Sequence, residues 1–257
     1  MTESPAIYQA GQVISYGAGV NSSALAIWLI NRGWKGKIVF SDPGCEWPET
    51  YCWMDYFQTE WLKPRGLEII RLKGLPWQRN GKGLSLIEYC ELKRTIPLAA
   101  VRWCTNWKTE PIKRWCELNG NPEQLIGIAC DESHRMPECN RPLVDLGITR
   151  EDCYKIIEAE GLSVPRKSGC YICPFQSPSG WRQLWKEHPD LFERAAELEE
   201  SCTRDSKDGY TATLDIAGKV TLRQRQASFE AQIPMFDDTD WDTLLRFKPC
   251  LCELGEA

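Results

Sequence analysis

Short apolar runs alternate along the chain with longer segments in which apolar residues recur every three or four positions. The short runs have the length and β-branched content of buried strands, and they occupy residues 12–17, 37–44, 67–72 and 123–130. The longer segments predict helices over residues 21–33, 48–62 and 105–120. A long loop is expected between the third strand and the helix that begins at residue 105. Strands that alternate with helices indicate an α/β fold with a parallel, twisted sheet covered on both faces.

The pattern changes after residue 139. The remainder predicts a helix, a loop that carries cysteines, two further helical stretches and a weakly patterned tail; the helices cover residues 147–162, 177–185 and 189–200. We therefore predict a sheet domain over residues 1–139 and a helical, cysteine-bearing C-terminal extension over residues 140–257.

The composition is that of an ordinary globular protein with a modest negative charge. The chain has 257 residues, of which 42% are hydrophobic and 26% charged, and its formal net charge is −5. That charge gives no general electrostatic reason to bind a nucleic acid. A basic stretch around Trp77, RLKGLPWQRNGKG, would suit a polyanion or a stacked base, although a solvated loop is its ordinary interpretation.

The chain carries no signal for a membrane or for secretion. No apolar run reaches the roughly 18 residues that indicate a membrane-spanning helix. The first residues, MTESPAIYQAGQ, lack the basic and apolar regions of a secretory signal. We expect a cytoplasmic protein with no membrane partner.

A loop rich in small residues joins the first predicted strand to the first predicted helix. Gly17, Ala18 and Gly19 let backbone N–H groups approach a phosphate closely, and the helix that follows adds its positive end. Ser22 and Ser23 add hydroxyl donors. The spacing matches neither the Walker loop nor the GxGxxG fingerprint, so an ordinary strand-to-helix turn remains the alternative.

Cysteine is unusually frequent, with 13 in the chain. Clustered cysteines in a reducing compartment indicate metal or redox chemistry more often than disulfides. Cys170 and Cys173 form a CxxC pair followed by Pro174, a turn that can direct two thiolates at one centre. This pair alone allows zinc, an iron–sulfur cluster or redox-active thiols.

The strand-to-helix loop resembles the PP-loop, the pyrophosphate-binding signature of ATP pyrophosphatases, with Asn21 where aspartate is usual. Further blocks resemble phosphoadenylyl-sulfate (PAPS) reductases and occur in that family's order: FSDPGCEWPETY, RWCTNWKTEPIKRW, GIACDESHR, RPLVDLGITREDCYKII and SGCYICPF. The chain therefore resembles the PAPS-reductase-like family of PP-loop proteins from about Gln12 to Phe175. The resemblance implies a Rossmann-like fold that binds an adenine nucleotide, ATP or PAPS or adenylyl sulfate, at the carboxyl ends of the strands.

The resemblance also implies roles for individual positions. The expected nucleotide-binding residues are Ser15, Tyr16, Gly17, Ala18, Gly19, Asn21, Ser22, Ser23, Asp42, Gly127, Glu132 and Arg135. Asp42 would contact the adenosine, and Lys108 and Arg135 would pair with phosphate or sulfate oxygens. The expected catalytic residues are Asn21, Lys108 and Cys252. Asn21 removes a charge that would assist magnesium, which leaves a magnesium requirement open.

Cys104 supplies a third thiolate, at the position where iron–sulfur members of the family carry a Cys-Cys pair; the first of that pair is Trp103 here. A 4Fe–4S cluster normally takes four cysteine ligands. We expect Cys104, Cys170 and Cys173, with Cys250 from the tail as the fourth. Cys252, Cys45 or an open iron site are the alternatives for that position, and zinc or free thiols are the alternatives to the cluster.

Three functions remain open. The first is ATP-dependent sulfur transfer, in which an acceptor is adenylated and then thiolated. The second is reduction of PAPS or adenylyl sulfate to sulfite, with Cys252 as nucleophile and thioredoxin as reductant. The third is a nucleotide- or cluster-binding module without catalysis. We favour sulfur transfer. The corresponding partners are a nucleotide substrate, a sulfur donor or thioredoxin, a nucleic-acid acceptor and a second copy in a homodimer.

Overall fold

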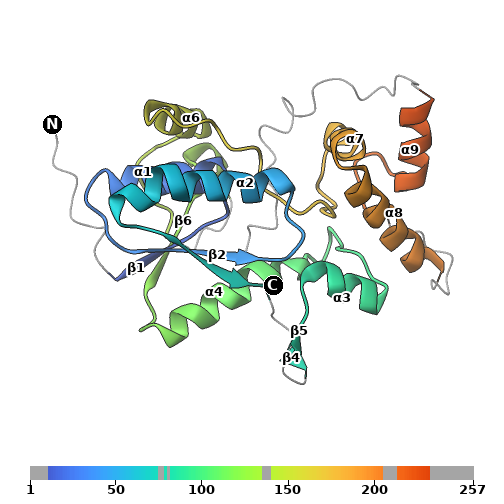
Figure 1. Cartoon of the computed structure of the whole chain (residues 1–257), viewed down its shortest axis with the longest axis horizontal. Coiled ribbons are helices and arrows are strands. Elements are labelled where there is room, and N and C mark those ends of the chain that lie inside the picture. The colour runs from blue at the N-terminus through green and yellow to red at the C-terminus, as the bar shows by residue number, and fades with distance from the viewer. Residues whose placement is uncertain (1–10, 75–77, 80–81, 135–139, 205–212, 232–257) are drawn as a thin grey trace.

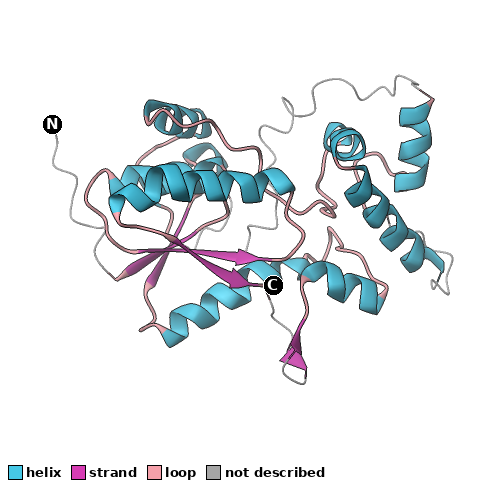
Figure 2. Cartoon of the chain, in the orientation of Figure 1, coloured by secondary structure: helices cyan, strands magenta, loops and turns pink. Residues whose placement is uncertain are grey.

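The structure is a computed structural model that describes residues 11–74, 78–79, 82–134, 140–204 and 213–231. These residues form an α/β fold around a four-stranded, all-parallel sheet with the order β3-β2-β1-β6 (Figures 1 and 2). The strands are β1 (Gln12–Ser15), β2 (Lys37–Asp42), β3 (Ile69–Lys73) and β6 (Glu123–Ile126). Ile14 of β1 pairs with Ile38 on one side and with Leu125 on the other. The expected α/β fold with a Rossmann-like parallel sheet is confirmed at this level.

Helices cover both faces of the sheet. Figure 1 shows α1, α2 and α6 on one face and α4 on the other; their bounds are Val20–Ile30, Pro48–Tyr56, Arg150–Ala159 and Asn106–Leu118. Successive residues of β1 point to opposite faces. Ile14 belongs to the large apolar core on the side of α1, whereas Val13 packs with Ile112 and Cys116 of α4. The central strand is therefore buried on both sides, as its continuous apolar run predicts.

The second helix extends into a rarer geometry. α2 begins with Pro48, where a missing N–H costs little, and continues after Tyr56 as a π-helical segment, Phe57–Leu62. The rings of Trp53, Phe57 and Trp61 stack in sequence along this segment. The expected helix over residues 48–62 is therefore present, but its last turn and a half is wider than an α-helix.

Pro111 lies inside α4 and docks that helix onto the sheet. A proline at this position cannot donate to the carbonyl of Trp107, four residues earlier. The Trp107 carbonyl instead accepts the hydroxyl of Ser41 on β2 at 2.7 Å. The loss of one helical hydrogen bond is thus compensated by a bond between helix and strand.

A second group of helices lies beyond the carboxyl ends of β2 and β3 (Figure 1). It consists of α3 (Leu86–Lys93), α7 (Pro178–Glu187), α8 (Pro189–Arg204) and α9 (Leu222–Glu230). Their apolar side chains, among them Ile87, Trp181 and Phe192, form a second buried cluster with Cys45 and Trp107. This cluster joins residues from both sides of the boundary expected at residue 139.

Two expectations were wrong in detail. The segment between β3 and α4 is not a loop throughout, because it holds α3 and a short hairpin, β4 (Gln78–Arg79) with β5 (Lys82–Gly83). The tail contains α9. Both helices begin with a capping box, at Ser85 with Glu88 and at Thr221 with Gln224.

The smaller elements are α5 (Pro142–Asp145) and the 3-10 turns Lys63–Arg65, Trp103–Thr105 and Cys130–Glu132. Within the described residues, none of the helices is both long enough and apolar enough to span a bilayer.

Candidate functional site

The glycine loop after β1 directs backbone donors at one point. The N–H groups of Gly17 and Gly19 both donate to the hydroxyl oxygen of Ser22, with distances of 3.3 Å each. Ala18 between them has a φ of 54°, the left-handed conformation that makes successive N–H groups converge. Because α1 begins at Val20, the positive end of its dipole lies at the same place. An anion that displaced the Ser22 hydroxyl would meet these two backbone donors and a helix N-terminus.

The other hydroxyls predicted around this loop are used inside the fold. The hydroxyls of Tyr16 and Ser23 lie 2.9 Å apart, and the indole N–H of Trp53 donates to both at 3.2 Å. Burial raises the pKa of Tyr16 to about 12. The Ser15 hydroxyl donates to Gln124 at 3.0 Å. These hydrogen bonds fix the loop to the protein core. The groups of the loop that remain to contact a phosphate are the backbone N–H groups and Ser22.

Asn21 is held by the loop that follows β6. Its side-chain N–H donates to Glu132 at 3.0 Å, and Arg150 lies 3.3 Å from the other oxygen of the same carboxylate. Glu132 is buried, so an aspartate at position 21 would place two carboxylates side by side out of water. The amide of Asn21 avoids that repulsion.

Gly127 allows this close approach. A Cβ atom at this position would lie 2.7 Å from the Cα of Ser22, which is backbone and cannot move aside. Gly127 therefore brings the end of β6 directly against the first turn of α1. In a doubly wound sheet the crevice between these two strand ends is the place where ligands bind.

Asp42 shapes the loop after β2. One oxygen of its carboxylate accepts the N–H of Gly44 and the hydroxyl of Tyr51, both at 2.7 Å. Burial and this hydrogen bond raise the pKa of Tyr51. A contact between Asp42 and adenosine stays a prediction.

The three cysteines predicted as metal ligands lie close together. Cys104 sits in the turn before α4, and Cys173 closes a turn by donating its N–H to the carbonyl of Cys170 at 3.0 Å. Burial, and then the neighbouring thiols of Cys170 and Cys173, raise the pKa of Cys104 to about 12. Burial and Cys170 likewise raise the pKa of Cys173 to about 11. Lys108, one helical turn after Cys104, acts in the opposite direction on both thiols.

The spacing of these sulfurs helps to distinguish a cluster from zinc. Thiolates around a tetrahedral zinc ion lie about 3.8 Å apart. Among the described residues, the cysteines do not form a group of three with all sulfurs within 4.8 Å of one another. Ligands of a four-iron cluster bind different iron atoms and lie farther apart. Three converging thiols in a largely apolar surrounding, with a nearby lysine, fit such a cluster.

Sequence reasoning gave no role to Glu46, which connects the loop after β2 to the cysteines. Its side chain is fully buried, and one oxygen lies 2.6 Å from the Lys108 ammonium. The Cys170 thiol donates to the same oxygen at 3.8 Å. The signal available in the sequence was a charged residue flanked by Cys45 and Trp47, at the point where a buried strand ends.

The glycine loop and the CxxC loop are in contact. A Cβ on Gly19 would lie 2.8 Å from the hydroxyl of Ser168, two residues before Cys170. The backbone of the CxxC loop also pairs with the loop after β2, since the Trp47 N–H donates to the Gly169 carbonyl at 3.1 Å. The predicted phosphate loop and the loop that carries two of the predicted metal ligands therefore lie next to each other.

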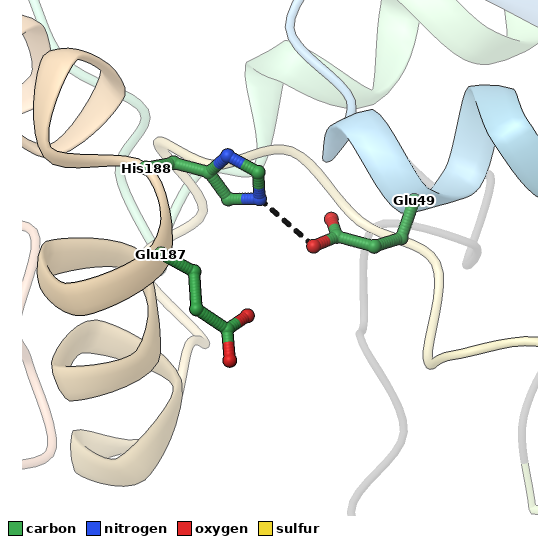
Figure 3. Close-up of side chains that lie close together, drawn as sticks. All are labelled: Glu49, Glu187 and His188. Atoms are coloured by element: carbon green, nitrogen blue, oxygen red, sulfur yellow. Dashed lines mark hydrogen bonds and ion pairs between the residues drawn. The ribbon is translucent and has the colours of Figure 1, made fainter.

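A separate polar group lies between α2 and the junction of α7 with α8 (Figure 3). Ligand atoms of Glu49, Glu187 and His188 lie within 4.8 Å of one another, and His188 Nε2 is 2.8 Å from Glu49. Arg166 lies 3.8 Å from the same Glu49 oxygen and 3.5 Å from the centre of the Trp47 ring. Since His188 and Arg166 already face the Glu49 carboxylate, we assign this group, the Glu49 clasp, to structure and not to a metal.

Four predicted residues lie outside the described part of the chain. They are Trp77, Arg135, Cys250 and Cys252. Their predicted roles in nucleic-acid contact, anion binding, metal ligation and catalysis stay predictions.

No protein-family model matches the chain, and no curated protein matches it significantly. The resemblance to PAPS-reductase-like proteins therefore rests on the quoted motifs and their order.

Proposed function

We propose that the chain is an adenine-nucleotide-binding enzyme that transfers sulfur to an acceptor activated by ATP. The observation that supports this best is the contact between the glycine loop and the CxxC loop, at Gly19 and Ser168. A phosphate bound at Gly17 and Gly19 would lie beside the cysteines, so activation and sulfur chemistry would share one site.

The reaction has two steps. An acceptor oxygen attacks the α-phosphorus of ATP, the bond from that phosphorus to the bridging oxygen breaks, and pyrophosphate leaves. Hydrosulfide then attacks the activated carbon, the carbon–oxygen bond breaks, and AMP leaves with both electrons of that bond. When bound, an iron–sulfur cluster would supply redox-active iron beside the nucleotide.

The chain's own residues would bind and orient the reactants. The amides of Gly17 and Gly19 and the start of α1 would hold the departing pyrophosphate. Lys108, fixed by Glu46, would place a positive charge between the nucleotide and the cysteines. Because Asn21 supplies no carboxylate, magnesium would reach the site bound to the triphosphate.

The test begins with protein purified without oxygen. We expect about four irons and four acid-labile sulfides per chain, which the single substitutions Cys104→Ala, Cys170→Ala and Cys173→Ala each abolish. Cys153→Ala is the control, because Cys153 is a buried cysteine that belongs to the first apolar core and not to the cluster around the CxxC loop. Stoichiometric zinc, or no metal, would overturn the cluster.

Turnover then separates the reactions. ATP with hydrosulfide and total RNA as acceptor should release AMP and pyrophosphate. Release of sulfite from PAPS with thioredoxin, in place of these products, would select sulfonucleotide reduction. Tight nucleotide binding without either product would indicate a binding module.

A further inference from the structure

Cys45 lies in the loop after β2, next to the CxxC loop. The Tyr171 N–H donates to the Cys45 carbonyl at 2.9 Å, and Glu46 pairs with Cys170 in an antiparallel bridge. These backbone bonds fix the two loops against each other over two consecutive residues. The position of Cys45 relative to Cys170 is therefore set by main chain, not by flexible side chains.

Cys45 and Cys170 are also buried in the same second apolar cluster, which Cys104 and Cys173 border. Cys45 is only 1% exposed. Cysteine at this depth is either an inert apolar residue or a metal ligand. The backbone pairing of the Cys45 loop with the CxxC loop, inside a cluster that Cys104 and Cys173 border, favours a ligand.

We propose that Cys45 provides the fourth thiolate of the iron–sulfur cluster that Cys104, Cys170 and Cys173 hold. This inference rests on the cluster of the proposed function. Ligation would replace the S–H bonds of the thiols with bonds to iron and would release their protons.

Cys90 is the competing ligand inside the fold. It lies on α3, is fully buried, and is close enough to Cys104 and Cys170 for their charges to act on it. Unlike Cys45, it belongs to a helix, and the structure gives it no backbone pairing with the CxxC loop. Cys90 therefore provides a matched control for Cys45.

The assignment has two consequences. A cluster with four cysteine ligands has no vacant iron, so hydrosulfide would have to be held by the protein. The cluster would also fix the position of the loop that begins at Asp42. Because this loop borders the predicted nucleotide site, loss of iron would weaken nucleotide binding. Cys250 and Cys252 would remain available for other chemistry.

The experiment compares anaerobic preparations of the full chain. They carry Cys45→Ala, Cys45→Ser, Cys90→Ala, or Cys250→Ala together with Cys252→Ala. Iron, sulfide and electron paramagnetic resonance are measured for each. We expect both Cys45 variants to hold at most three irons and, if three remain, to show the resonance of an oxidised three-iron cluster. The Cys90 variant and the double tail variant should keep four.

Four irons in both Cys45 variants would overturn the assignment, as would loss of iron in the Cys90 or tail variant alone. If the wild type itself holds no iron, the proposed function fails. That outcome differs from failure of the Cys45 assignment, in which the wild type does hold iron. Far-ultraviolet circular dichroism of the iron-free proteins identifies a variant that lost iron because it failed to fold. If Cys45→Ala fails to fold, the iron content of the near-isosteric Cys45→Ser variant decides the assignment.

As a second readout, ATP affinity should fall at least tenfold in Cys45→Ala and should be unchanged in Cys90→Ala. Equilibrium dialysis with ATP measures both. An unchanged affinity in a Cys45 variant that has lost iron would contradict the link between the cluster and the nucleotide loop.

Discussion

The two buried regions of the molecule differ in what they contain. The core between the sheet and α1, α2 and α6 is built from aliphatic and aromatic side chains, with Cys153 as its one described cysteine. The second cluster contains or borders six described cysteines: Cys45, Cys90, Cys104, Cys170, Cys173 and Cys202. The first region is built from strands and helices whose apolar periodicity is visible in the sequence. The second also brings together loops more than a hundred residues apart, and the groups able to do chemistry gather there.

The largest effect is expected at a buried ion pair in the second region. Asp215 and Arg225 are both almost fully buried, and Arg225 Nε donates to Asp215 at 2.6 Å. Asp215→Ala leaves a buried positive charge without its carboxylate, which should lower the free energy of unfolding by about 3–5 kcal/mol. Urea unfolding followed by circular dichroism measures the change.

The exposed pair of Asp55 with Arg71 is the control for that measurement. Asp55→Ala should cost no more than about 1 kcal/mol, because both side chains are solvated. An equal loss in the free energy of unfolding in Asp215→Ala and Asp55→Ala would show that the second region is open to water in solution. A separate early transition in Asp215→Ala would show that this region unfolds independently of the sheet.

Substituting one leucine in each buried region allows the two regions to be compared directly. Leu25 lies in the first region and Leu184 in the second, and both are fully buried. Each substitution to alanine should cost about 2–5 kcal/mol, since each removes the same atoms from a packed interior. Only Leu184→Ala should also lower the iron content. Iron loss in Leu25→Ala of equal size would remove the distinction between the regions.

A glycine pair tests the nucleotide side of the site. In Gly127→Ala the new methyl group would overlap the backbone of Ser22, at a cost of about 1–3 kcal/mol. We expect at least tenfold weaker ATP binding by equilibrium dialysis, because the start of α1 must shift. Gly169→Ala has open space around its new Cβ and should bind ATP as the wild type does.

The smallest effect is expected at the Glu49 clasp. Burial alone would raise the pKa of Glu49, but the hydrogen bond from His188 and the charges of His188 and Arg166 lower it overall. A carboxylate with a lowered folded-state pKa stabilises the protein above its unfolded pKa, about 4.3, and loses this as pH falls through the folded value. The carboxylate is partly exposed, so the contribution is at most about 1 kcal/mol.

Urea unfolding at several pH values should therefore find Glu49→Gln less stable than the wild type at pH 6. The two curves should converge as the pH falls below the lowered folded-state pKa of Glu49, where the group is protonated in both folded and unfolded chains. A difference that persists unchanged at low pH would show that Glu49 acts through packing and not through its charge.

The sequence predicted the sheet well, because each strand carries its own apolar run and each covering helix its own periodicity. It missed α3, although Ser85 and Glu88 form a recognisable capping box, because the helix has only eight residues and a weak apolar face. The three expected metal ligands come together in the fold. Spacing alone could not choose among the candidates for a fourth, because Cys45 is 125 residues from Cys170 along the chain and only tertiary pairing of the loops brings them into contact.

The proline in α4 has a consequence for how the site moves. Since the Trp107 carbonyl is bound to the hydroxyl of Ser41, the first turn of α4 is tied to β2. The first turn of α4 should therefore unfold locally only together with β2. Slow hydrogen exchange in the sheet should then be accompanied by slow exchange at the start of this helix. Lys108 lies in that turn and shares its rigidity. The charge beside the cysteines is therefore held in position before any ligand arrives.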